Sequence, residues 1–237
     1  MNDLLRREAR LLLALGALLL LLNVPGGRFV LYPFQLFSTW VHELAHGLAA
    51  LALGGSIDRL QIFSDGSGLA HTLRPEGRLA TAFVASAGYL GTAIVGAGML
   101  SLRRLPRLGR AGILALGAAL VLSDVLLVRN PFGLLALGLL GAGLVVAGRK
   151  LKQEAAGTLF AFLAAAVSLN AVTSIQALFS PILLVNGQPT GRSDAQAVAE
   201  ALLLPAPVWA GLWLGLAVVL TALALRFPAG DRRAGRR

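Results

Sequence analysis

The sequence predicts an all-α polytopic membrane protein with six or seven transmembrane helices and one small β-hairpin. Hydrophobic residues make up 57% of the 237 residues and charged residues only 14%, far from the balance of a soluble domain. Uncharged stretches, most of them long enough to cross a bilayer as a helix, recur along the chain. They are residues 11–27, 79–102, 130–148, 155–191 and 201–225. No polar segment between them is long enough for a separate soluble domain, so residues 1–237 are predicted to form one membrane domain.

The amino-terminal segment predicts a short first helix. Arg6, Arg7 and Arg10 precede the apolar run Leu11–Leu22. A signal peptide has the same basic-then-apolar pattern, but no cleavage site with small residues follows this run. We therefore expect an uncleaved helix, with a signal peptide as the alternative.

The next segment predicts a helix followed by a hairpin. The helix extends from Phe29 to Gly55 and ends at a glycine pair, as helices commonly do. Strands are predicted at Ile57–Phe63 and Leu69–Leu73, around the turn Ser64–Gly68. Lipid cannot satisfy an open sheet edge, so this hairpin must lie at the interface or beside a water-filled cavity. It could bind an extended peptide by strand addition, or it could be a structural connector.

The remainder of the chain predicts four membrane helices, a short amphipathic helix and a last span. Small residues in the first and last of these helices allow close packing in lipid. Residues 180–191 are rich in turn formers and are expected to be a loop, and Ser193 or Asp194 could cap the amphipathic helix. The helices are predicted at 79–102, 111–128, 132–148, 157–178, 195–204 and 205–225.

Composition also excludes several partners and cofactors. The net charge of +10 could suggest nucleic acid, but the arginines lie in short loops between apolar runs. Membrane topology and anionic lipid headgroups explain that placement, so we expect lipid and no nucleic acid as a partner. The chain has no cysteine, which leaves His, Asp and Glu as the strong metal ligands. The Arg-, Ala- and Leu-rich composition favours a bacterial, multi-pass protein of the cell (inner) membrane, and it indicates no oligomeric state.

One motif, His42-Glu43-Leu44-Ala45-His46, carries the candidate chemistry. On a helix, His42 and His46 project from one face, where both can bind one Zn²⁺ while Glu43 acts as general base on a water molecule. An ionisable group at bilayer depth costs about 2.5–3.5 kcal/mol, so three within five residues indicate a function. The alternative is a polar helix face buried against the rest of the protein.

A catalytic zinc site needs a third protein ligand, and the sequence leaves three candidates. The third histidine of a metzincin motif is absent, and His71 on the hairpin is more typical of a surface residue. The remaining acids are Asp124, Asp194 and Glu200. Asp124 is expected to contact Arg129, and Glu200 fits the polar face of the amphipathic helix. Asp194 follows a long uncharged run at the start of that helix.

Several segments together resemble one family of membrane peptidases. They are the H-E-x-x-H helix, the glycine pair after it, the hairpin turn at Asp65–Gly68, and Ser193-Asp194-Ala195 before Pro205 and Trp209. In order and spacing they resemble the M50B-like branch of the site-2-protease metallopeptidases. The resemblance implies zinc held by His42, His46 and a distant aspartate, for which it selects Asp194. The N-P-x-D-G-type motif and the PDZ domain of other site-2 proteases are absent.

The sequence thus predicts an intramembrane zinc metalloendopeptidase whose substrates are membrane proteins. A non-catalytic membrane metal-binding or scaffold protein and a transporter are the alternatives. The intact Glu43 favours the enzyme over the scaffold. The transporter is disfavoured because transporters of this size commonly contain internal repeats, and the motif occurs once.

Overall fold

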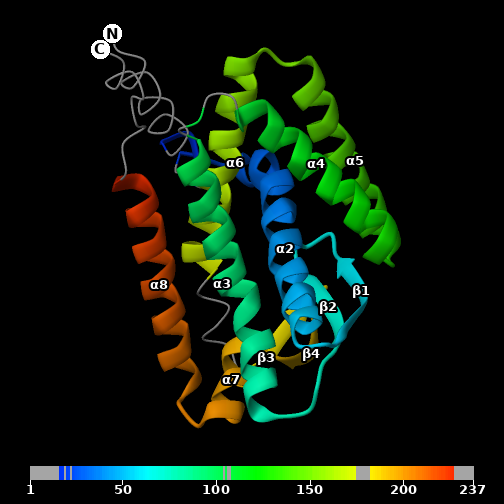
Figure 1. Ribbon diagram of the computed structural model, residues 1–237, viewed down its shortest axis with the longest axis vertical. Helices are drawn as coiled ribbons and strands as arrows, with labels where there is room; N and C mark the ends of the chain where they lie inside the picture. Colours follow the sequence, from blue (N-terminus) through cyan, green and yellow to red (C-terminus); the bar gives the residue numbers. More distant parts are fainter. Residues whose placement is uncertain are drawn as a thin grey trace, which may run out of the picture.

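The protein is a bundle of long helices with two β-hairpins gathered at one end (Figure 1). It is described by a computed structural model, which covers residues 16–18, 20, 21, 23–103, 105, 108–174 and 182–226. The long helices are α2 (Gly27–Ala52), α3 (Arg78–Leu102), α4 (Leu108–Leu127), α5 (Pro131–Lys150), α6 (Gln153–Thr173) and α8 (Ala206–Arg226), and α7 (Asp194–Leu202) is short. The hairpins are β1 (Ser56–Ile62) with β2 (Gly68–Leu73), and β3 (Ile182–Val185) with β4 (Gln188–Arg192). The predicted fold class, a helical membrane protein with a small hairpin after the motif helix, is confirmed.

Five of these helices, α3, α4, α5, α6 and α8, are long and apolar enough to cross a membrane. With 20 to 25 residues each, they span about 30–38 Å at 1.5 Å per residue. Helix α2 has 26 residues and runs beside α3 through the bundle, but it is not among the five (Figure 1). The predicted first helix, residues 11–22, falls mostly outside the described residues. The described chain thus contains five candidate spans and α2, against the six or seven spans predicted.

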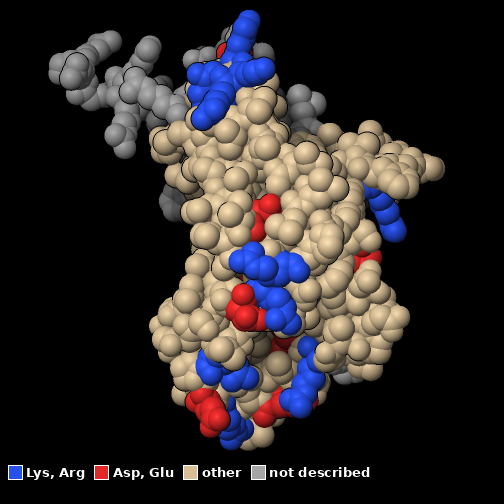
Figure 2. Space-filling model, turned by 90° about the vertical axis from the view of Figure 1, so that its right-hand side faces the viewer, with Lys and Arg blue, Asp and Glu red and all other residues tan. Residues whose placement is uncertain are grey.

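Charge divides the two ends of the bundle. One end, where α3, α5 and α8 finish, is almost purely basic, and we call it the basic end. The other end, with both β-hairpins and α7, is the hairpin end, where acidic and basic side chains mix (Figure 2). Among described residues, the basic end carries Arg103, Arg110, Arg149, Lys150, Lys152 and Arg226 beside Glu154. The hairpin end carries Arg59, Arg74, Arg78, Arg129 and Arg192 beside Asp58, Asp65, Glu76, Asp194 and Glu200.

The first hairpin is fixed to the junction between α4 and α5. Leu60 forms a parallel bridge with Val128 and accepts a hydrogen bond from the Arg129 backbone N–H at 3.1 Å. Asn130 donates its side-chain amide to the Ile62 carbonyl at 2.6 Å and accepts from the Ile62 N–H at 3.1 Å. The outer edge of β1 is therefore paired along this stretch.

Residues 182–191 do not form the loop that we predicted for residues 180–191. Within the described part of this segment, β3 and β4 pair as a second antiparallel hairpin. Its turn is Asn186-Gly187, with φ angles of 52° and 70°. Positive φ at both central turn residues matches the twist of paired strands, and Asn-Gly is the dipeptide that adopts it most readily. The second hairpin binds the first, because the Asn186 backbone N–H donates to Ser67 Oγ at 3.0 Å.

The predicted contact between Asp124 and Arg129 is wrong. The Arg129 guanidinium donates instead to the Val125 and Leu126 carbonyls in the last turn of α4 and to the Val128 carbonyl just after it, the last at 2.7 Å. These carbonyls have no partner within the helix, and the negative end of the helix dipole attracts a cation there. Asp124 is buried, and its Oδ1 has no hydrogen-bond partner among the described residues.

Candidate metal centre

Three side chains from two widely separated segments of the sequence meet at one point between α2, α3 and α7. His42 and His46 lie one turn apart on α2, and their Nε2 atoms are 3.1 Å apart. The Asp194 Oδ2 atom lies 3.2 Å from the Nε2 of His42 and 3.3 Å from that of His46. Among the described residues, this is the one group of three or more His, Asp or Glu side chains that could hold a metal ion. The third-ligand candidates Asp124 and Glu200 are not part of it.

The spacing of these donor atoms fits a tetrahedral metal ion. Two ligand atoms bound at about 2.0–2.1 Å to one tetrahedral zinc lie about 3.3–3.4 Å apart. The three measured separations of 3.1 to 3.3 Å are close to that value. Two imidazoles and one carboxylate, with no thiolate, form a donor set that suits zinc and leaves a fourth position for water.

The orientation of His46 explains why a cation belongs at this point. Its Nδ1 lies 2.7 Å from the Val84 carbonyl of α3. A carbonyl only accepts, so Nδ1 carries the hydrogen, and in the neutral ring Nε2 presents a lone pair. That lone pair faces the Nε2 of His42 and the carboxylate of Asp194. The arrangement is unfavourable unless a proton or a metal ion lies between these atoms.

Asp194 is placed by the helix that it begins. Ser193, and not Asp194, is the N-cap of α7, and its hydroxyl accepts from the Gln196 N–H at 3.4 Å. The Asp194 side chain is therefore free to point toward the histidines of α2. Burial acts to raise the pKa of its carboxyl, but the charge of His46 and hydrogen bonds from both histidines outweigh burial and hold this pKa below its usual range. A metal cation would act in the same direction.

Two other predicted residues lie apart from this cluster. Glu200 is on the outer side of α7, where it forms an ion pair with Arg192. His71 is on β2, and its Nε2 lies 2.8 Å from Gln61 Oε1 across the hairpin. Burial first, and the charge of Arg59 second, lower the pKa of His71. Both residues therefore have partners that are independent of the metal cluster.

Helix α3 approaches the cluster more closely than any side chain would permit. A Cβ atom on Gly88 would overlap the Nε2 atoms of both His42 and His46. Gly88 lies one turn after Val84 on the same face of α3, so this face closes one side of the cluster. Because Gly88 has no side chain, space remains for the Nε2 atoms of His42 and His46 to approach each other.

Glu43 is buried beside the first hairpin. It is 7% exposed, and a side chain at Gly68 of β2 would collide with Glu43 and with Thr39. Thr39 donates its hydroxyl to the Gly66 carbonyl at 2.8 Å, which holds the hairpin turn against α2. The hairpin thus fixes this carboxylate next to the cluster instead of leaving it in solvent.

The residues that α3 contributes were not predicted from the sequence. In the sequence, Gly88 is only one of several small residues suited to helix packing. Val84 acts through its backbone carbonyl, which leaves no signal in the side-chain pattern. The aromatic ring of Tyr89 is 4.8 Å from that of His42, measured between centroids, and Tyr89 belongs to no motif that would draw attention to it.

Comparison with known proteins gave one match. A family model described as Peptidase M50B-like matches residues 11–224 of the chain. No curated protein and no solved structure matches it.

Proposed function

Because the chain belongs to the Peptidase M50B-like family, a family of membrane metallopeptidases, we propose that it is an intramembrane zinc metalloendopeptidase. The observation that carries this proposal is the meeting of His42 and His46 with Asp194, which lies 152 residues after His42, beside a buried glutamate. Five candidate spans support a membrane location. We further propose that the chain is one domain in the cell membrane of a bacterium.

His42, His46 and Asp194 are proposed to hold the zinc ion. When bound, zinc supplies a positive charge that polarises a carbonyl group and makes water more acidic. The chain's own residues prepare this position: Val84 fixes the ring of His46, and Gly88 leaves room for the ion.

Glu43 is proposed as the general base and, afterwards, the general acid. Its carboxylate takes a proton from the attacking water as the water oxygen bonds to the scissile carbonyl carbon. The π electrons of that carbonyl move to its oxygen and give a tetrahedral intermediate with an oxyanion. When the intermediate collapses, the C–N bond breaks, and Glu43 returns the proton to the leaving nitrogen. The products are a carboxylic acid and an amine, which become a carboxylate and an ammonium group by proton transfer at neutral pH, and Glu43 is regenerated.

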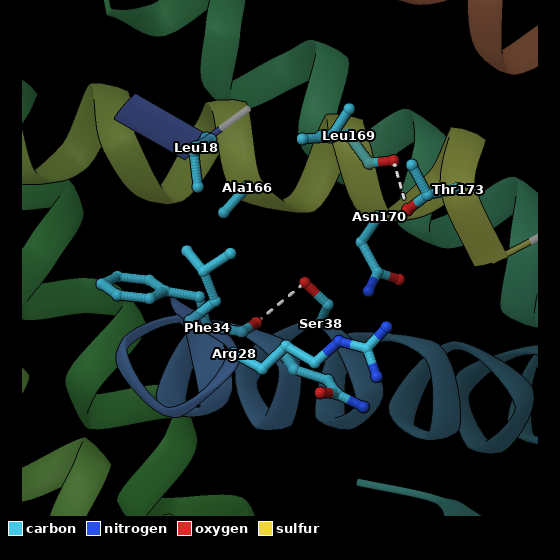
Figure 3. A pocket seen from close by; sticks show the side chains of 10 residues that line it. Leu18, Arg28, Phe34, Ser38, Ala166, Leu169, Asn170 and Thr173 are labelled. Carbon is cyan, nitrogen blue, oxygen red and sulfur yellow. Dashed lines mark hydrogen bonds between the residues drawn. The ribbon is translucent and has the colours of Figure 1, made fainter. Parts of the chain in front are cut away.

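A cavity of about 320 Å³ between α2 and α6 is proposed to receive part of the substrate. Ser38 of α2 and Asn170 of α6 line it from opposite sides, with apolar residues such as Phe34 beside them, and the Ser38 hydroxyl is turned toward the Phe34 carbonyl of its own helix (Figure 3). Ser38 lies four residues before His42, so the cavity and the cluster share one face of α2. Polar side chains at membrane depth commonly mark a substrate path, which supports this assignment.

The substrates are proposed to be single-span or tail-anchored membrane proteins with a locally unwound helix. Helical peptide bonds are shielded and hydrogen-bonded, so some unwinding must precede attack. Gly or Pro near the cut should therefore increase the cleavage rate. Efficient, sequence-independent cleavage of soluble casein would contradict this substrate class.

Metal content and cleavage, measured side by side, test the mechanism. Glu43→Gln should retain zinc and lose hydrolysis, because both histidines stay in place while the base is removed. His42→Ala and His46→Ala should lose both. If Glu43→Gln cleaves a membrane substrate at the wild-type rate, the hydrolase mechanism is wrong.

The third ligand is tested with matched carboxylates. Asp194→Ala should lose zinc and activity, whereas Asp124→Ala and Glu200→Ala should keep their zinc. Full zinc binding and turnover in Asp194→Ala would refute the proposed ligand set.

A further inference from the structure

Tyr89 lies directly beside the candidate metal cluster without belonging to it. It follows Gly88 on α3, and the planes of its ring and the His42 ring meet at 90° with centroids 4.8 Å apart. Trp213 of α8 stacks on Tyr89, at 5.6 Å between centroids and 14° between planes. Two neighbours from two different helices therefore fix the orientation of the phenol ring.

The Tyr89 hydroxyl has no hydrogen-bond partner in the part of the chain that the structure describes, although its ring packs against His42. The Nε2 of that histidine lies 3.2 Å from the Asp194 carboxylate, so the phenol is one side chain away from the carboxylate of the cluster. The nearby hydroxyls of α2 are already engaged. Thr39 donates to the Gly66 carbonyl at 2.8 Å, and Ser38 donates to the Phe34 carbonyl at 3.0 Å.

Peptide hydrolysis is accelerated by a hydrogen-bond donor placed at the scissile carbonyl oxygen. The tetrahedral intermediate carries an oxyanion, and a positioned donor stabilises it more than it stabilises the ground-state carbonyl. Glu43 and Asp194 are acceptors when ionised, and the Nδ1–H of His46 is used by Val84. Tyr89, by contrast, has a ring held in place by its neighbours and a hydroxyl that donates a hydrogen bond to no described residue.

We propose that the Tyr89 hydroxyl donates a hydrogen bond to the oxyanion formed on the scissile carbonyl oxygen. This inference rests on the proposed function and assigns it a further catalytic residue. The role requires the hydroxyl, whereas packing against His42 and Trp213 requires only the ring. Tyr89→Phe separates the two, because it removes the oxygen and keeps the ring.

The experiment compares wild type, Tyr89→Phe and Tyr32→Phe, all loaded with zinc. Tyr32 is the other tyrosine of the chain, and its hydroxyl donates to the Ser64 carbonyl at 2.8 Å. Single-span reporter proteins with a Gly-Pro pair in the helix, reconstituted in lipid vesicles, serve as substrates. Tyr89→Phe should keep one zinc per chain and an unchanged KM, while kcat falls about 10²-fold, the usual effect of losing one oxyanion donor. Tyr32→Phe should stay within about twofold of wild type.

A second readout does not depend on turnover. A phosphonamidate peptide imitates the tetrahedral intermediate, so its affinity should fall in Tyr89→Phe by about the same factor as kcat/KM. A wild-type kcat in Tyr89→Phe overturns the proposal, and so does loss of zinc from that variant, which would indicate that the residue only positions His42. If wild type shows no Glu43-dependent cleavage of any reporter, the proposed function itself fails, and this inference fails with it.

Discussion

Replacing Gly88 by alanine is the sharpest test of how the two histidines are held. The change adds one methyl group at a helical position where alanine is otherwise preferred over glycine by about 1 kcal/mol. Backbone propensity alone therefore predicts a slightly more stable helix. The structure predicts the loss of the metal site, because the methyl group would occupy the place where both Nε2 atoms lie.

The expected size of the effect follows from the geometry. The added Cβ would lie 2.5 Å from the His42 Cε1 atom and closer still to the two Nε2 atoms, whereas ordinary contacts begin at 3.4 Å. The rings or α3 must therefore move by roughly 1 Å, twice the tolerance of about 0.5 Å within which a functional constellation keeps its geometry. Loss of a secondary contact to a ligand already costs 10- to 100-fold in metal affinity, so displacing two ligands should cost at least about 100-fold.

The assay is zinc content by mass spectrometry together with competition against a chelator of known affinity. Gly98→Ala is the matched control, because Gly98 lies on the same helix and a Cβ there has no neighbour within 4 Å. Gly98→Ala should bind zinc like wild type. If Gly88→Ala also retains wild-type zinc affinity, our account of the close approach between α2 and α3 is refuted.

Three further predictions concern stability and sidedness. Asn130→Ala removes the partners of the buried N–H and C=O groups of Ile62. It should lower the free energy of unfolding, measured by thermal denaturation, by about 2–4 kcal/mol. A decrease below about 0.5 kcal/mol would contradict the anchoring of β1. Free zinc at 1,000 times its Kd should raise the free energy of unfolding of wild type by about 4 kcal/mol and leave that of Asp194→Ala unchanged. An equal increase in both proteins would show that Asp194 is not a zinc ligand. The chain has no cysteine, so single cysteines report sidedness. By the positive-inside rule, Lys150→Cys at the basic end should be labelled only after cells are opened, and Glu76→Cys at the hairpin end in intact cells. The reverse pattern would invert the orientation.

The sequence predicts most of the scaffold because its signals are strong and local. Long apolar runs, uncharged in α3 and α8, predict α3, α4, α5 and α8 to within a few residues, since crossing a bilayer requires such runs. The second hairpin was missed although Asn186-Gly187 is a strong hairpin signal, because the flanking strands are short and β4 is mostly polar. The contact of Asp124 with Arg129 was wrong because free carbonyls at the end of α4 compete for the same guanidinium.

The candidate site was predicted only in part, for a related reason. The H-E-x-x-H spacing is a local pattern, so the facing arrangement of His42 and His46 follows from one helix. The position of Asp194 next to these histidines depends on how α7 packs. From residue type alone, three acidic residues remained candidates for the third ligand. The roles of Val84 and Gly88 depend on a backbone carbonyl and on an absent side chain. Neither has a sequence pattern until the packing of α3 against α2 is known.

The long separation between His42 and Asp194 has a consequence for the order in which the protein is made. At about 5–20 residues per second, a ribosome needs about 8–30 s to extend the chain over these 152 residues. Throughout that time, the proposed base and two of the three proposed metal ligands are present in the nascent chain, but the carboxylate that completes the cluster is not. A partly synthesised copy would therefore not attack other proteins that enter the membrane beside it. Hydrolysis would begin only when α7 reaches α2.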